Sequence, residues 1–179
     1  MRAIPAIQRK LRHARQTFQL LQASAHAIPL DHEVCERQVS DFLSAAYSVE
    51  DIIRNRPGKR PWVDRWWSKR HPEDQALHSF MRKQRKAELH YLGAAVRTMP
   101  QEISYQDYLR RAPAMQSGRH GGYHYGPQWS GPVGMEIPNI PVEIDTLLLG
   151  DEAVAERCGR YLTLLEQMVE AFQAAYPTS

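Results

Sequence analysis

Apolar residues spaced three and four positions apart recur over four long segments of the chain, and this spacing constrains the fold more than any other feature. In an α-helix such spacing places the apolar side chains on one face. The four runs lie within residues 4–25, 31–56, 72–100 and 151–176. Helices with one apolar face bury it against one another. The sequence therefore predicts a mainly α fold, an antiparallel four-helix bundle, formed by a single domain over residues 1–179.

Residues that start or stop helices separate the first three runs. Asp31 is suited to cap the second helix, and the Pro57-Gly58 pair is expected to end it. Residues 55–72 are then predicted to be a connection in which three tryptophans stand among cations: Trp62, Trp66 and Trp67. Aromatic rings among cations can stack bases over a phosphate-binding groove. The favoured interpretation is that they pack as a lid over the end of the bundle.

Residues 100–150 break the helical pattern because they are rich in glycine and proline. A short helical turn is expected over Tyr105–Arg111, and short strands near Tyr123 and residues 141–144. The segment is predicted to be an irregular or short β-hairpin insertion between the third and fourth helices. A long segment of this kind in a small domain is usually functional or interfacial.

The third run, predicted to form one helix over residues 77–99, has an unusual charge pattern. Its apolar arc comprises Leu77, Phe80, Met81, Ala87, Tyr91, Leu92, Ala95 and Met99, and two polar residues, Gln84 and Glu88, fall on the same arc. Its opposite arc is cationic: Arg82, Lys83, Lys86, His90 and Arg97, with Arg85 at the edge. A solvent-exposed helix face usually mixes charges of both signs. A face of one sign indicates an anionic partner.

Cations also gather elsewhere, although the net charge is only +3. Residues 1–30 contain arginines and lysines without an acid, and residues 54–71 contain many with Asp64 as their single acid. This distribution favours a basic surface that attracts phosphate groups or an acidic protein.

Several other kinds of site are not expected. Cys35 and Cys158 form no CxxC pattern and are predicted to be buried free thiols. His120 and His124 have no acidic or cysteine neighbours that would complete a metal site, so neither a metal nor another cofactor is expected. The chain lacks an apolar run of ~20 residues, so no membrane span is predicted. No signal-peptide pattern precedes the first helix, and a cytoplasmic protein is expected.

Arg85 and His90 form an Arg-x4-His pattern in the third predicted helix. About two matches to Arg-x(4–6)-His are expected by chance, and the chain has three: Arg65/His71, Arg85/His90 and Arg119/His124. Only the second lies within a predicted long helix. This context resembles the HEPN superfamily (higher eukaryotes and prokaryotes nucleotide-binding), small helical bundles with this motif near the end of the third helix. The phrase FLSAAYSVEDIIR, residues 42–54, is similar to an aromatic–small–Ser–Val phrase frequent in that family.

The resemblance implies a metal-independent endoribonuclease, often the toxin of a toxin–antitoxin or phage-defence pair. His90 would act as general base or acid on the ribose 2′-OH or the leaving oxygen, and Arg85 would stabilise charge on the phosphate. The other cations, Arg82, Lys83, Lys86 and Arg97, would contact RNA phosphates. Arg85 and His90 project about 140° apart and about 7.5 Å along a straight helix. The site is therefore expected to form across a homodimer, with a cognate antitoxin or another protein as a further partner.

One residue departs from the family pattern. Lys86 follows Arg85, where HEPN proteins usually have a small polar residue. An alternative function is therefore a non-catalytic HEPN-like interaction module that binds nucleic acid or an acidic protein partner. In this alternative the insertion at residues 100–150 would shape the binding surface.

Overall fold

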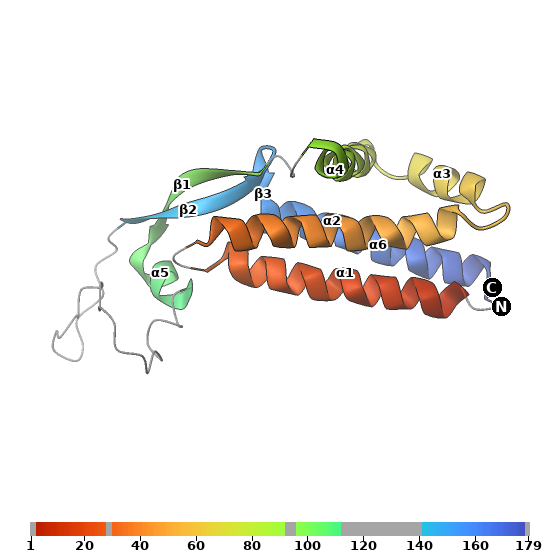
Figure 1. Cartoon of the computed structure of the whole chain (residues 1–179), viewed down its shortest axis with the longest axis horizontal. Helices are drawn as coiled ribbons and strands as arrows, with labels where there is room; N and C mark the ends of the chain where they lie inside the picture. The colour runs from red at the N-terminus through yellow and green to blue at the C-terminus, as the bar shows by residue number, and fades with distance from the viewer. Residues whose placement is uncertain (1–2, 28–29, 92–95, 112–140, 178–179) are drawn as a thin grey trace.

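The fold is mainly helical, with one small antiparallel sheet (Figure 1). The computed structural model describes residues 3–27, 30–91, 96–111 and 141–177. Its elements in chain order are α1 (Ala3–Ala25), α2 (His32–Arg54), α3 (Arg60–Ser68), α4 (Pro72–Tyr91), β1 (Val96–Ser104), α5 (Tyr105–Arg111), β2 (Pro141–Leu149), β3 (Glu152–Ala153) and α6 (Val154–Ala175). The mainly α class predicted from the spacing is confirmed.

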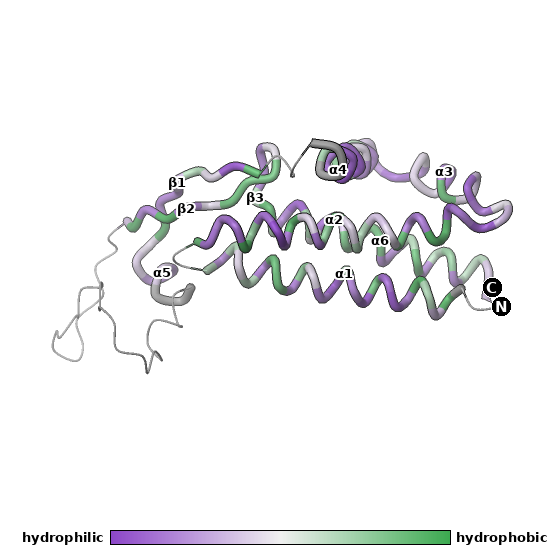
Figure 2. Tube along the Cα trace, in the orientation of Figure 1, coloured by the Kyte–Doolittle hydropathy of each residue, from purple (hydrophilic) through white to green (hydrophobic). Residues whose placement is uncertain are grey.

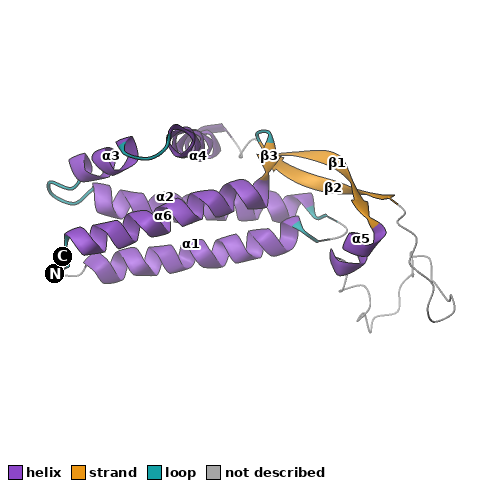
Figure 3. Ribbon diagram, turned by 180° about the vertical axis from the view of Figure 1, so that it is seen from behind, coloured by secondary structure: helices purple, strands orange, loops and turns teal. Residues whose placement is uncertain are grey.

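Three of the long helices, α1, α2 and α6, lie side by side along the long axis of the molecule (Figures 1 and 3). The short α1–α2 connection makes these two antiparallel, and α6 runs back so that the two termini lie together. Their predicted apolar faces form the core, with fully buried side chains that include Ile7, Leu21, Val39, Phe42, Leu165 and Phe172. The hydropathy along the helices alternates accordingly between the buried and outer faces (Figure 2).

Helix α2 begins just after the residue that was predicted to cap it, Asp31. The Asp31 side chain accepts a hydrogen bond from the backbone N–H of Val34 at 3.0 Å, which satisfies one of the donors left free in the first turn. Glu33 in the first turn adds a negative charge where the helix dipole favours one. The expected N-cap at Asp31 is confirmed.

Helix α4 departs from the predicted arrangement in two ways. It is seen end-on in Figures 1 and 3, so it lies across α1, α2 and α6 instead of beside them. The helix predicted to reach Met99 also ends at Tyr91, and strand β1 begins at Val96. That part of the prediction is wrong. Val96 and Thr98 are β-branched, and pairing with β2 satisfies their backbone more fully than an exposed helix end could.

The sheet has the strand order β1-β2-β3, and all its pairs are antiparallel. β1 and β2 pair from Val96↔Leu149 to Ser104↔Pro141, which places Pro100 on an edge strand where a missing N–H is tolerated. Gly150, with φ of 71°, allows the turn that leads into β3. The strand expected at residues 141–144 is present within β2, and Tyr105–Arg111 is helical. The strand expected near Tyr123 lies outside the described residues.

The segment predicted as a connection, residues 55–72, contains the helix α3. Trp66 and Trp67 are buried, and the partly buried Trp62 packs edge-on against Phe172 with ring centroids 5.2 Å apart. Their main role is therefore packing, as the favoured interpretation held. Through these rings α3 attaches to the core at the end where the chain termini lie.

None of the helices within the described ranges has the length and apolar character that a membrane span requires. Both cysteines are buried and free. Burial raises the pKa of the Cys158 thiol far above its ordinary value, and burial together with the charge of Asp31 raises that of Cys35. Neither thiol is therefore a reactive nucleophile at neutral pH.

Candidate functional site: a cationic groove above a buried carboxylate

A groove of about 470 Å³ runs along α4 and is bordered by α2. The described residues that line it are Tyr47, His78, Ser79, Arg82, Lys83, Arg85 and Lys86. None of these lining residues is acidic. A groove with this lining attracts anions and offers one aromatic ring, two hydroxyl groups and an imidazole beside the cations.

Helical periodicity brings these side chains together. His78, Arg82, Arg85 and Lys86 stand at positions i, i+4, i+7 and i+8 of α4, so they share one face of the helix. Leu77 and Met81 on the neighbouring face are buried in the core and hold α4 in place. The groove is therefore formed mainly by one rigid helix, with Tyr47 contributed by α2.

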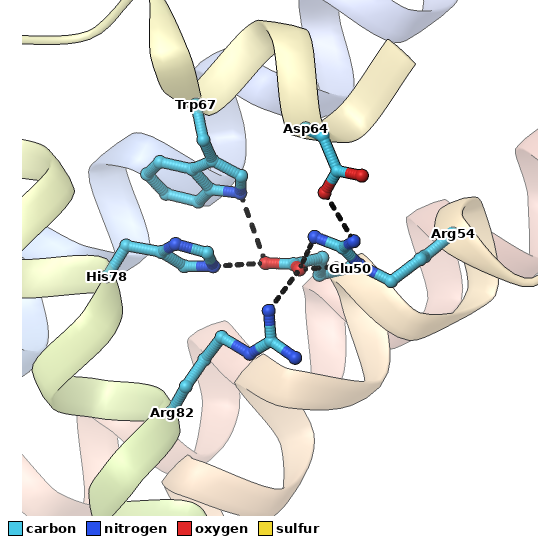
Figure 4. A network of polar contacts seen from close by, with 6 residues as sticks. All are labelled: Glu50, Arg54, Asp64, Trp67, His78 and Arg82. Atoms are coloured by element: carbon cyan, nitrogen blue, oxygen red, sulfur yellow. Dashed lines mark hydrogen bonds and ion pairs between the residues drawn. The ribbon is translucent and has the colours of Figure 1, made fainter. Parts of the chain in front are cut away.

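A buried carboxylate, that of Glu50 on α2, contacts two of the lining residues, His78 and Arg82 (Figure 4). Its Oε2 accepts hydrogen bonds from Nε2 of His78 at 2.7 Å and from Nε1 of Trp67 at 3.1 Å. Its Oε1 accepts two from Arg54, at 3.0 Å from Nε and 2.7 Å from a terminal nitrogen. The residue is only 3% exposed, so these bonds replace the water that an ionised carboxylate would otherwise need.

Two further charges connect this carboxylate to the surface. Arg82, which lines the groove, approaches Glu50 Oε1 to 3.9 Å. Arg54 also pairs with Asp64 of α3 at 2.5 Å, so its charge is shared between a buried and an exposed acid. The network thus joins α2, α3 and α4, and it includes two residues of the groove lining, His78 and Arg82 (Figure 4).

The pKa of Glu50 reflects the balance of these effects. Burial by itself would raise the pKa, but the hydrogen bonds and charges of His78 and Arg54 outweigh it and lower the pKa below the ordinary value of 4.5. Glu50 is therefore ionised at neutral pH. An ionised carboxylate is an acceptor only, so Nε2 of His78 carries the hydrogen of their bond.

His78 is held on more than one side. Its ring lies nearly parallel to that of Trp67, with centroids 3.8 Å apart and an interplanar angle of 10°. No hydrogen bond from its second nitrogen, Nδ1, is found within the described part of the chain. The imidazole is thus oriented by Glu50 and Trp67, and it forms part of the groove lining.

The predicted site residues are only partly gathered here. Arg82, Lys83, Arg85 and Lys86 all line the groove. His90 belongs to the last turn of α4, but its side chain lies outside the described residues. Arg97 is not on this helix: it lies on β1, donates to the Gly150 carbonyl at 3.1 Å and pairs with Asp151 at 2.8 Å. Its predicted place on the cationic face of a continuous helix is wrong, because α4 ends before it.

No sequence pattern had predicted a site role for four of the residues found here: Glu50, His78, Tyr47 and Ser79. A signal was present for Glu50, which the spacing places at the core face of its helix, whereas His78 falls on the cationic face beside Arg82 and Arg85. A glutamate beside Val49 and a histidine beside Leu77 are too polar to be buried singly, and they satisfy each other. Tyr47 and Ser79 carry no comparable signal.

No group of three or more histidine, cysteine or acidic side chains that could hold a metal ion is found in the described ranges. His120 and His124 lie outside those ranges. Comparison of the chain with protein-family models, with curated proteins and with solved structures finds no match in any of the three.

Proposed function

We propose that this protein binds single-stranded RNA through the groove on α4 and cleaves it as a metal-independent endoribonuclease of the HEPN type. The observation that carries the proposal is the gathering of four cations, Arg82, Lys83, Arg85 and Lys86, around a groove whose described lining contains no acid. Phosphate contacts from such side chains supply most of the affinity of proteins for nucleic acids. Tyr47 at the same groove offers a ring on which a base can stack.

The proposal takes α1, α2, α4 and α6 as the counterparts of the four helices of a HEPN bundle. The resemblance in residues 42–54 then falls on α2, and the Arg85–His90 motif falls on α4. Arg85 stabilises the phosphate, and His90 acts as general base or acid from across a homodimer. Arg97, which lies on β1 and pairs with Asp151, is not one of the groove cations in this proposal. A toxin or defence role in the cytoplasm, with an antitoxin as protein partner, belongs to the same proposal.

RNA cleavage tests the enzymatic part. The purified protein in EDTA is expected to cleave single-stranded RNA, and His90→Ala is expected to slow cleavage by about 100-fold or more, because general acid–base groups contribute about this much. His13→Ala, which alters an exposed histidine on α1, serves as the control. Absence of cleavage by the wild-type protein, or an unchanged rate in His90→Ala, contradicts the proposal.

RNA binding tests the groove itself. The double substitution Lys83→Ala/Lys86→Ala is expected to weaken binding of single-stranded RNA by about 10-fold at 0.1 M salt and to reduce the salt slope of log K by ~1.4, since each phosphate contact contributes about 0.7 for single strands. Fluorescence anisotropy over a series of salt concentrations measures both. The matched control, Lys10→Ala/Arg12→Ala on α1, removes the same charge away from the groove. Equal losses in the two double variants would show that only net charge matters.

A second candidate function is a non-catalytic HEPN-like module that holds nucleic acid or an acidic protein. Lys86 favours it, because this residue replaces a small polar one and adds a fourth cation to the groove. Binding that depends on Lys83 and Lys86, without any cleavage, is the result expected for this function.

A further inference from the structure

The histidine that accompanies Arg85 on the face of α4 is His78. Seven residues separate His78 from Arg85, so the two side chains project within about 20° of each other and about 10.5 Å apart along the axis. Arg82 lies between them, one turn from His78. His90 of the same chain is twelve residues from His78, about 18 Å along the helix. Within one chain, the groove therefore combines His78, Arg82 and Arg85.

The surroundings of His78 match those of an acid–base group. Its Nε2–H donates to the buried, ionised Glu50 at 2.7 Å, so whenever the ring is neutral its hydrogen is on Nε2. The lone pair is then on Nδ1. A carboxylate behind an imidazole also stabilises the imidazolium that forms when Nδ1 takes a proton.

The charged and polar groups around His78 come from four helices. α2 contributes Glu50, Arg54 and Tyr47, and α3 contributes Trp67, with Asp64 one step away through Arg54. Arg82 belongs to α4 itself. From α6, the ring of Tyr161 lies 6.4 Å from that of His78, and burial raises the pKa of its hydroxyl, which therefore stays neutral.

The geometry points to His78, oriented by Glu50, as the general base that acts on an RNA phosphodiester bound in the groove by Arg82 and Arg85. This inference rests on the proposed ribonuclease function and adds a residue that the Arg-x4-His motif does not contain. It also places a base and its phosphate-binding cations within a single chain.

The step balances without any further reagent. Nδ1 of His78 accepts the proton of the ribose 2′-OH while O2′ forms a bond to phosphorus. The bond from phosphorus to O5′ breaks, and O5′ takes a proton from water or from His90 of the partner subunit. The products are a 2′,3′-cyclic phosphate and a 5′-hydroxyl end. Arg82 and Arg85 offset the charge that develops on the phosphoryl oxygens.

The test compares two histidine variants in the single-stranded RNA cleavage assay. His78→Gln is expected to lower kcat by about 100-fold or more and to remove the rise of kcat/KM with pH on the acidic side. The matched control is His71→Gln, which changes an exposed histidine just before α4 and is expected to leave both unchanged. Circular dichroism checks that each variant is folded.

A measurement on the wild-type protein covers the case in which His78→Gln does not fold. Nitrogen-15 NMR of the histidine rings follows titration with an oligodeoxynucleotide, which lacks the 2′-OH and is not cleaved. The Nδ1 resonance of His78, assigned through its contact with the Trp67 ring, is expected to shift, whereas that of His71 is not. An unmoved His78 resonance overturns the inference.

The two proposals fail in different ways. If the wild-type protein cleaves RNA and folded His78→Gln cleaves it equally fast, His78 is not the base and the ribonuclease function stands. If the wild-type protein cleaves no RNA, the ribonuclease function fails, and the role of His78 in proton transfer fails with it.

Discussion

Replacing Glu50 with alanine is expected to lower the free energy of unfolding by about 3–5 kcal/mol, since breaking a buried charged network costs this much. The change removes the acceptor of the Trp67 and His78 hydrogen bonds, and among the described residues it leaves Arg54 with Asp64 as its acidic partner. Urea unfolding followed by circular dichroism measures the loss. Glu36→Ala, an exposed glutamate on the same helix, is the control and is expected to change stability by less than about 0.5 kcal/mol.

The same carboxylate makes stability depend on pH. The pKa of Glu50 is lower in the folded protein than its ordinary value of 4.5, so the folded state holds this proton less tightly than the unfolded chain. Its contribution is therefore fully present above about pH 5 and is lost as the pH falls through the folded-state pKa. A Glu50→Gln variant should lose stability at neutral pH and show a weaker further loss on acidification. Equal acid sensitivity in the variant and the wild type would contradict this assignment.

The sequence predicts the helices well because their formation depends on a local pattern. Most of the apolar positions that the spacing picks out in residues 4–25, 31–56 and 151–176 are buried in α1, α2 and α6. The prediction fails where local preference and long-range pairing compete. In the sequence, residues 96–99 continue the apolar spacing of the helix before them. In the structure they pair instead with β2, some fifty residues later in the chain. Spacing within one segment carries no information about such a partner.

The candidate site also has a part that the sequence predicts and a part that it does not. The cations of α4 are predictable, since Arg82, Lys83, Arg85 and Lys86 share a helix whose periodicity follows from the sequence. The pairing of Glu50 with His78 is not, because it depends on α4 lying across α2 at one particular height. Either residue alone suggests only a polar group near the core. Their contact becomes visible when the crossing of the two helices is known.

Replacing Trp67 with alanine is expected to cost about 3–5 kcal/mol of unfolding free energy, as do other large-to-small changes in cores. Trp67 is 5% exposed and packs against Trp66, His78 and Tyr161. The loss removes the ring that attaches α3 to the floor of the groove. Thermal unfolding measures it, and a loss below about 1 kcal/mol would indicate that α3 is not held to the core by this side chain.

Substitution of Trp67 by phenylalanine separates its hydrogen bond from its packing. Phenylalanine keeps an aromatic ring but cannot donate to Glu50. Because hydrogen bonds to charged groups contribute about 1.5–3 kcal/mol, Trp67→Phe is expected to lower the free energy of unfolding by about this amount. Trp62→Phe is the matched control, because no hydrogen bond of the Trp62 indole is found in the ranges that the structure describes.

A double-mutant cycle then shows whether Trp67 and Glu50 act as one unit. Trp67→Phe and Glu50→Ala each abolish the same Nε1–Oε2 hydrogen bond, so the doubly substituted protein should lose less stability than the two single losses added together. The expected difference is about 0.5–3 kcal/mol, the range found for residues in direct contact. Strictly additive losses would mean that the indole and the carboxylate stabilise the fold independently. Trp67 would then help to orient His78 through the stacking of the two rings alone.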